Sequence, residues 1–106
     1  GRAYELIYVN GAGWKGTRES SVIRVLHPSN VASKIGHPTP KPVGLMASLI
    51  RKAPAGVIAD PFSGSGSTLV AAKTEGRRAI GVEFWEKYCE IAARRLSQDT
   101  LFGGIE

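Results

Sequence analysis

The stretch GVIADPFSGSGST, residues 56–68, joins an apolar run to a loop of glycines and serines. Its first part, Gly56–Asp60, is short, apolar and closed by an acid, which predicts a strand buried on both faces. Two glycines of the loop, Gly64 and Gly66, permit backbone angles closed to other residues and let a ligand approach the main chain. In open α/β sheets, ligands bind at the carboxyl ends of the strands. We therefore expect a binding loop over residues 60–68.

The segments on either side of the loop alternate between helix and strand. A helix is predicted over Ser67–Glu75, ended by Gly76 in the left-handed conformation, and a second apolar strand over Arg78–Glu83. Further helices are predicted to begin at Pro42 and to cover Trp85–Ser97. A strand, a crossover helix and a second strand form a βαβ unit, whose two strands should be parallel and adjacent. Because two such strands alone do not make a stable sheet, the fold is expected to need more strands.

This pattern of predicted helices and strands divides the chain into three segments. Residues 1–41 are irregular and hold β-forming runs at Tyr4–Val9 and Ser21–Leu26, each predicted to be a strand. Residues 42–98 form the α/β region, and residues 99–106 are expected to be a loose tail. The predicted fold class is therefore α/β.

The loop does not match two familiar phosphate-binding motifs. A P-loop requires a lysine, and none lies between Asp60 and Val70. A dinucleotide fingerprint that starts at Gly64 would need its third glycine where Leu69 stands. Because the loop also carries no cation, a diphosphate is disfavoured. An amino-acid-like or nucleoside ligand fits the loop better.

The second strand ends in an acid, Glu83, which is followed by two aromatic residues, Phe84 and Trp85. An acid at this place in a nucleotide-binding βαβ unit accepts both hydroxyls of a ribose. One of the aromatic rings could pack on a purine face. The plainer alternatives are a surface acid at a strand end and an aromatic residue of the core.

The composition fits one small domain of 106 residues with a positive bias. Fourteen Lys and Arg against nine Asp and Glu give a net charge of +5, which favours contact with polyanions such as nucleic acid, or simply a solvated positive surface. The single cysteine, Cys89, excludes a disulfide within the chain and is typical of a reducing compartment. No apolar run approaches the length of a membrane span, and one cysteine with two histidines argues against a structural zinc site.

Three linked motifs resemble those of the S-adenosylmethionine-dependent DNA amino-methyltransferases, which modify adenine N6 or cytosine N4. His37–Pro42, HPTPKP, resembles the H-P-T-x-K-P motif of that family. Residues 60–68, DPFSGSGST, resemble its D-P-F-x-G-S-G-T-T loop, with Ser67 in place of the first threonine. Gly81–Glu83 resembles its G-x-E strand end. The motifs occur in the order of the family's β arrangement, which implies a partial Rossmann-like methyltransferase sheet.

The resemblance implies S-adenosylmethionine as the cofactor. Main-chain groups at Asp60 and Phe62 would meet its ammonium group, whereas hydroxyls of Ser65 or Thr68 and the following helix N-terminus would meet its carboxylate. Glu83 would hold the ribose. The cofactor-binding residues implied are Thr39, Lys41, Asp60, Pro61, Phe62, Gly64, Ser65, Gly66, Thr68, Glu83, Phe84 and Trp85.

Within the first motif, Thr39 and Lys41 would add to the contacts with the carboxylate, and His37 would stabilise the loop or contact the ligand. The implied substrate is double-stranded DNA, whose target base must be flipped out before methylation. The implied location is the cytoplasm of a bacterium, or of one that hosts a phage encoding the protein, without a membrane partner.

The family's catalytic motif, an acid or polar residue followed by Pro-Pro and an aromatic, has no counterpart here, because the sequence contains no Pro-Pro pair. We therefore assign no catalytic residue. The chain is expected to be the carboxyl-terminal, cofactor-binding part of a methyltransferase, inactive alone, that pairs its strands with a missing upstream half or with a second copy. The alternatives are a non-catalytic or split-subunit cofactor-binding module, or a methyltransferase that acts on RNA or protein.

Overall fold

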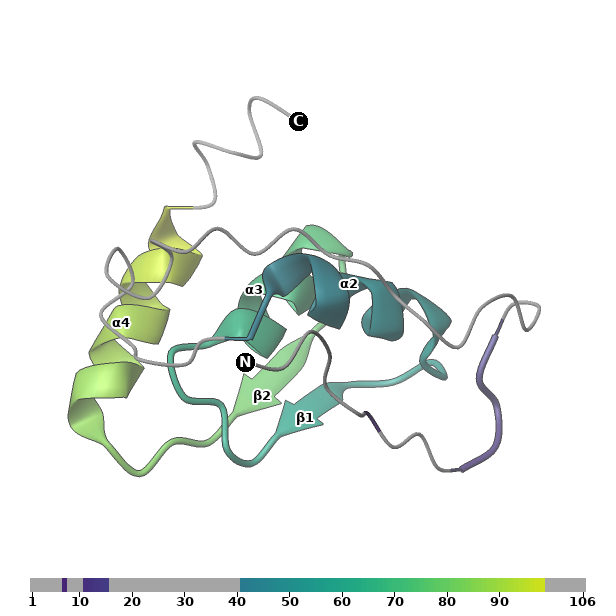
Figure 1. Cartoon of the computed structure of the whole chain (residues 1–106), viewed down its shortest axis with the longest axis horizontal. Coiled ribbons are helices and arrows are strands. Elements are labelled where there is room, and N and C mark those ends of the chain that lie inside the picture. The colour runs from purple at the N-terminus through teal and green to yellow at the C-terminus, as the bar shows by residue number, and fades with distance from the viewer. Residues whose placement is uncertain (1–6, 8–10, 16–40, 99–106) are drawn as a thin grey trace, which may run out of the picture.

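The computed structural model describes residues 7, 11–15 and 41–98 (Figure 1). The order of elements is α2, β1, α3, β2 and α4, as the sequence predicts for residues 42–98. Their bounds are α2 Val43–Lys52, β1 Ile58–Asp60, α3 Ser67–Thr74, β2 Ala79–Gly81 and α4 Glu86–Ser97. The predicted strands at 4–9 and 21–26 and the tail at 99–106 lie outside the described residues, apart from Ile7.

The two strands are parallel and form the predicted βαβ unit around α3. Ile58 pairs with Ala79 and Asp60 with Gly81. Both strands are shorter than predicted, three residues each, but backbone hydrogen bonds continue past their ends. The amide of Val82 donates to the Asp60 carbonyl at 2.9 Å, and the amide of Ser63 donates to the Val82 carbonyl at 2.9 Å. The start of the loop is thus tied to the residues that follow β2.

A small core joins α2 and α3 to one face of this sheet. Its buried members are Ala47, Ile50, Ala71 and Ala72, and Ile58 and Ala79 of the strands pack against it together with Val43 and Met46. Ala71 and Ala72 have no exposed surface. Such small side chains let the helix lie close to its neighbours, so α3 serves as the centre of the described fold.

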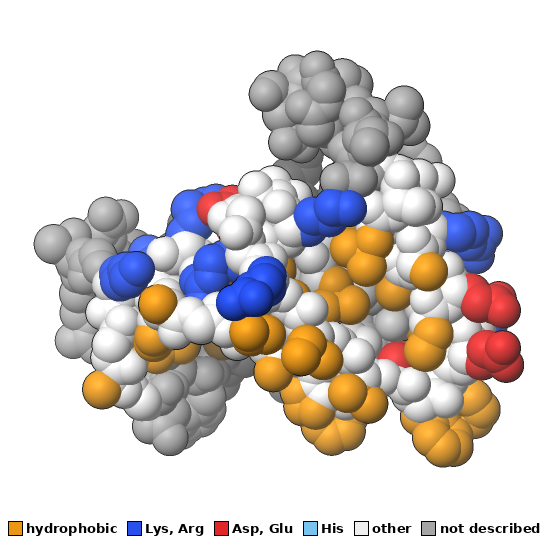
Figure 2. Space-filling model, turned by 180° about the vertical axis from the view of Figure 1, so that it is seen from behind, with side chains coloured by type: hydrophobic (Ala, Val, Ile, Leu, Met, Phe, Trp, Pro, Cys, Tyr) orange, Lys and Arg blue, Asp and Glu red, His pale blue; other side chains and the backbone are white. Residues whose placement is uncertain are grey.

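Within the described residues, no helix or strand covers the opposite face of the sheet. In the described residues the apolar side chains that point away from the core are exposed: Val57, Ala59, Ile80 and Val82. Burial of the strands on both faces, which the apolar runs predict, is therefore wrong for these two strands as described. Figure 2 shows hydrophobic side chains gathered on the lower part of one face of the molecule, with Lys and Arg above them. None of the helices within residues 41–98 has the length and hydropathy of a membrane span.

The end of α3 is held by the left-handed glycine that the sequence predicts. Gly76 has φ +70°, and its amide donates to the Lys73 carbonyl at 3.1 Å. The next amide, of Arg77, donates to the Ala72 carbonyl at 2.8 Å. These two bonds form a Schellman motif, which satisfies the last carbonyls of the helix and turns the chain toward β2.

The side chain of Arg77 caps the C-terminal end of another helix, α2. Its guanidinium donates to the carbonyls of Ile50, Pro54 and Gly56 at 3.2, 2.7 and 2.9 Å, and more weakly to that of Ala53 at 3.5 Å. These carbonyls belong to the last turn of α2 and to the segment that leads into β1. One side chain therefore fixes how α2 meets the sheet.

We expect Arg77→Ala to lower the free energy of unfolding by about 2 kcal/mol, because several part-buried carbonyls lose a charged donor. Urea unfolding followed by circular dichroism measures this effect. Arg78→Ala is the matched control, since Arg78 is adjacent and exposed. Equal stability losses in the two variants would contradict the role given to Arg77.

Candidate functional site

The loop between β1 and α3 is shaped by its own hydrogen bonds. The Asp60 carboxylate accepts the Phe62 amide at 3.1 Å, which closes a turn around the exposed Pro61. The Gly66 amide donates to the Ser63 carbonyl at 2.9 Å. The acid that ends the strand therefore shapes the turn with which the loop begins.

Gly66 is required by packing against α4. It has φ +90°, and a Cβ there would lie 2.8 Å from the Cβ and 3.3 Å from the Cα of Ala92. The sequence predicts that this glycine leaves space for a ligand. The structure corrects that reason, because the space beside its Cα is filled by a helix. Gly64 also has a left-handed backbone, with φ +53°.

A third glycine, at the end of β2, lets the loop lie against the sheet. A Cβ on Gly81 would lie 2.8 Å from the Cβ of Ser63 and 2.8 Å from Cδ1 of Leu69. The motif at residues 81–83 therefore begins with glycine for a packing reason. The loop and the start of α3 occupy the volume that a side chain would need.

Glu83 links the loop to the turn that follows β2. One carboxylate oxygen accepts the Gly64 amide at 2.9 Å, and the other accepts the Trp85 amide at 2.8 Å. A carboxylate offers about four acceptor sites, so further sites remain for hydroxyl donors of a ligand. The predicted strand-end acid is thus brought to the loop, where it also holds the backbone in place.

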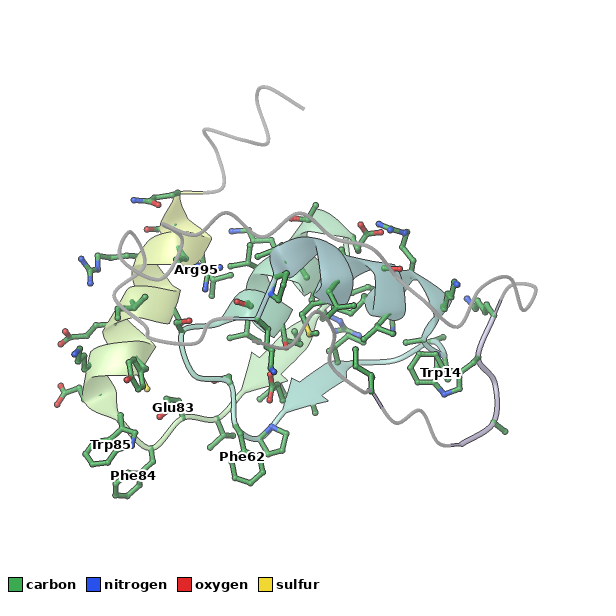
Figure 3. All side chains as sticks on the ribbon, in the orientation of Figure 1. Trp14, Phe62, Glu83, Phe84, Trp85 and Arg95 are labelled. Carbon is green, nitrogen blue, oxygen red and sulfur yellow. The ribbon has the colours of Figure 1, made fainter. Side chains whose placement is uncertain are left out.

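Three exposed aromatic side chains surround this acid in Figure 3, where Phe62 lies on one side of Glu83 and Phe84 and Trp85 on the other. Phe62 and Phe84 are each 88% exposed, and Trp85 is 62% exposed. The rings of Phe84 and Trp85 meet edge to face with centroids 5.2 Å apart. The alternative that Trp85 belongs to the core is wrong. These exposed apolar rings lie beside the carboxylate and offer surfaces on which the flat ring of a ligand can stack.

Arg95 of α4 reaches the centre of the loop. Its Nη1 donates to the Ser65 carbonyl at 2.9 Å and lies 3.3 Å from both the Ser65 and the Ser67 hydroxyl oxygens. Ser65 is only 2% exposed, so its side chain faces the protein interior. Burial lowers the pKa of the Arg95 guanidinium below its ordinary value.

Sequence reasoning did not single out Arg95 as a functional residue. A signal was present, because Arg95 follows the buried Ile91 and Ala92 of α4 by four and three positions. Residues at these spacings share one face of a helix. A cation on the apolar face of a helix needs oxygen partners, and here the binding loop supplies them.

The remaining predicted site residues divide into two groups. Thr68 lies in the first turn of α3, and within the described part of the chain its hydroxyl has no hydrogen-bond partner. Lys41 is exposed, just before the start of α2. Thr39 and His37 lie outside the described residues. No three His, Cys, Asp or Glu side chains in residues 41–98 are placed to hold a metal ion.

Known proteins resemble this chain in sequence. A family model described as DNA methylase matches residues 12–94. The methylase YubD of Escherichia coli (strain K12) is 48% identical over 63 residues, 58% of this chain and 28% of that protein. The type II methyltransferase M.ScaI of Streptomyces caespitosus is 36% identical over 84 residues, 79% of this chain and 25% of that protein. This chain therefore spans about a quarter of the length of these curated relatives.

A solved structure shares the fold. The crystal structure of the M1.HpyAVI–SAM complex matches with a TM-score of 0.65 and 31% identity, over 79% of this chain and 43% of that one. The expected partial Rossmann-like fold is thereby confirmed.

Proposed function

Because the chain belongs to the DNA methylase family, we propose that residues 42–98 are the S-adenosylmethionine-binding portion of a DNA methyltransferase. The observation that carries this proposal is the junction of the loop with Glu83. Two parallel strands end together, the first in a glycine loop and the second in a carboxylate that accepts the Gly64 amide at 2.9 Å. This is the edge at which α/β sheets bind ligands.

The residues of the loop fit the amino-acid half of the cofactor. Helix α3 begins at Ser67 without a side-chain cap, which leaves amides of its first turn available to an anion such as a carboxylate. We assign the Thr68 hydroxyl, together with Thr39 and Lys41, to the same carboxylate. Main-chain groups at Asp60 and Phe62 would face the ammonium group. Ser65, whose side chain is buried, would take part through the backbone it holds.

The residues after β2 fit the nucleoside half. Glu83 retains acceptor sites for two ribose hydroxyls, and charged acceptors form the stronger class of hydrogen bonds. Phe84 and Trp85 offer exposed rings for the adenine. When bound, the cofactor supplies an activated methyl group for an exocyclic amine. The work of this region is to hold that group in one orientation, which is the main requirement of such a transfer.

The bare sheet face supports the view that this region works as part of a larger sheet. Val57, Ile80 and Val82 expose apolar surface, and only one edge of each described strand is paired. Open strand edges invite pairing with further strands. We propose that these strands belong to the remainder of a methyltransferase, which also supplies the catalytic residues. Pairing with a second copy is the alternative that sedimentation of the chain tests.

Equilibrium dialysis against labelled S-adenosylmethionine, with a methylation assay on the same samples, tests the function. We expect the chain to bind the cofactor without methylating DNA alone. We expect DNA to gain N6-methyladenine or N4-methylcytosine when the chain is joined to the remainder of such an enzyme. Absence of cofactor binding in the joined protein would refute the proposal. Methylation of RNA or protein, with DNA unmodified, would refute the assigned substrate.

A further inference from the structure

The guanidinium of Arg95 is half-buried between α4 and the start of α3 (Figure 3). All its hydrogen-bond acceptors are neutral oxygens: the Ser65 carbonyl and the hydroxyls of Ser65 and Ser67. No carboxylate within the described residues forms an ion pair with it. Arg51 differs in this respect, because it pairs with Glu75 at 2.9 Å on the surface.

This placement of a positive charge is costly. A guanidinium loses hydration when it is buried, and the lowered pKa of Arg95 reflects that loss. The N-terminal end of α3, where Ser67 lies, carries the positive end of the helix dipole, which repels a further cation. An apolar side chain of similar length would avoid this loss of hydration, but it would not donate to the oxygens of Ser65 and Ser67. Packing alone therefore does not account for an arginine at this position.

The contacts of Arg95 fall beside the two glycines of the loop that have a left-handed backbone. Ser65 and Ser67 flank Gly66, and Gly64 precedes them, so the two left-handed glycines alternate with the residues that Arg95 holds. Glu83 fixes the same loop from the other side through the Gly64 amide. Arg95 acts on the segment that leads into α3, whereas Glu83 acts on the segment nearer to β2.

We propose that Arg95 is a positioning residue for the amino-acid half of the cofactor: by holding Ser65 and Ser67 it fixes the backbone from which α3 presents its first amides. This inference rests on the proposed function and adds a division of labour to it. Arg95 governs the methionine end of the ligand and has no part in holding the ribose. The nucleoside half depends on Glu83.

Two ligands separate these roles: S-adenosylmethionine and 5′-methylthioadenosine, which lacks the amino-acid half. We expect Arg95→Met to weaken binding of S-adenosylmethionine about tenfold, the effect of losing a charged hydrogen bond. Its affinity for 5′-methylthioadenosine should change less than about twofold. Its unfolding midpoint in urea should change little, because the loss of the hydrogen bonds to Ser65 and Ser67 is offset by the removal of a buried charge that has no anionic partner. Arg95→Lys, which keeps a donor for the Ser65 carbonyl, should recover part of the lost affinity.

Arg94→Met is the matched control, because Arg94 is the neighbouring residue on the exposed side of α4. It should leave both affinities unchanged. Equal losses for the two ligands in Arg95→Met, or no loss for either, would overturn the inference while leaving the proposed function intact. Failure of the unmodified chain, and of the chain joined to the remainder of a methyltransferase, to bind either ligand would overturn the proposed function and this inference with it.

Discussion

Gly66→Val is expected to unfold the region around the loop and to abolish cofactor binding. A side chain at this position meets the Ala92 Cβ at 2.8 Å, closer than carbon atoms approach in proteins. The backbone at φ +90° adds a conformational penalty for any residue other than glycine. We estimate the combined cost at about 4 kcal/mol or more, from left-handed strain and overpacking together. Small domains have margins of about 5–15 kcal/mol, so this loss is a large part of the total. Urea unfolding and calorimetric titration measure the two effects.

A matched glycine separates the steric cost from the backbone cost. Gly76 has φ +70°, and a Cβ there would meet nothing within 4 Å. Gly76→Ala should therefore cost only the left-handed strain, about 1–2 kcal/mol, with cofactor affinity retained. If Gly66→Ala proved no more destabilising than Gly76→Ala, the contact with α4 would not be the reason for the glycine.

A compensating change tests the contact directly. Ala92→Gly removes the atom that obstructs a side chain at residue 66, at a cost of about 1 kcal/mol for glycine within a helix. The double variant Gly66→Ala with Ala92→Gly should then be more stable than the sum of the two single effects predicts. Strict additivity would contradict the expected clash between a side chain at residue 66 and Ala92.

Glu83→Ala is expected to produce the second large effect, a loss of cofactor affinity of about tenfold or more. In the proposed site the carboxylate accepts the ribose hydroxyls, and its removal also takes away two hydrogen bonds that hold the loop. The amides of Gly64 and Trp85 lose their partners, which should lower the free energy of unfolding by about 1–3 kcal/mol. Calorimetric titration gives the affinity, and urea unfolding gives the stability.

Two further variants serve as comparisons for the effects of Glu83→Ala on cofactor affinity and on stability. Glu90→Ala removes an exposed acid from α4 and should change neither quantity. Glu83→Gln keeps one acceptor oxygen and the length of the side chain but loses the charge, so its affinity should lie between the wild type and Glu83→Ala. A Glu83→Ala variant with reduced stability and unchanged affinity would assign Glu83 to the structure of the loop alone.

The elements were predictable wherever the signal is local in sequence. The apolar runs of β1 and β2, the amphipathic face of α2 and the left-handed Gly76 each depend on neighbours within a few residues. The parallel pairing followed from the βαβ order, because a crossover helix leaves little choice of topology. Strand lengths were overestimated, because the regular pairing begins at Ile58 and not at Gly56 on the first strand, and ends at Gly81 and not at Glu83 on the second.

The reasons behind individual residues were harder to predict, because they depend on contacts far apart in the sequence. The sequence suggests that Gly66 leaves room for a ligand beside its backbone. Only the position of α4 shows that a side chain at residue 66 would meet Ala92. The sequence analysis assigned no role to Arg95, because the serine that it holds lies 30 residues away in the chain. Glu83 was recognised as an acceptor, but its bonds to two backbone amides follow from the path of the loop.

The bare face of the two-stranded sheet has a consequence for the kinetics of folding. The side chains that fix the loop come from 19 and 30 residues away, and such short closures are rapid and cost little entropy. The βαβ unit should therefore collapse before more distant segments reach it. From that moment Val57, Ile80 and Val82 expose apolar surface to other nascent chains, which favours aggregation. In the proposed complete enzyme, further strands would end this exposure. The yield of folded protein should thus depend on how soon that cover is supplied.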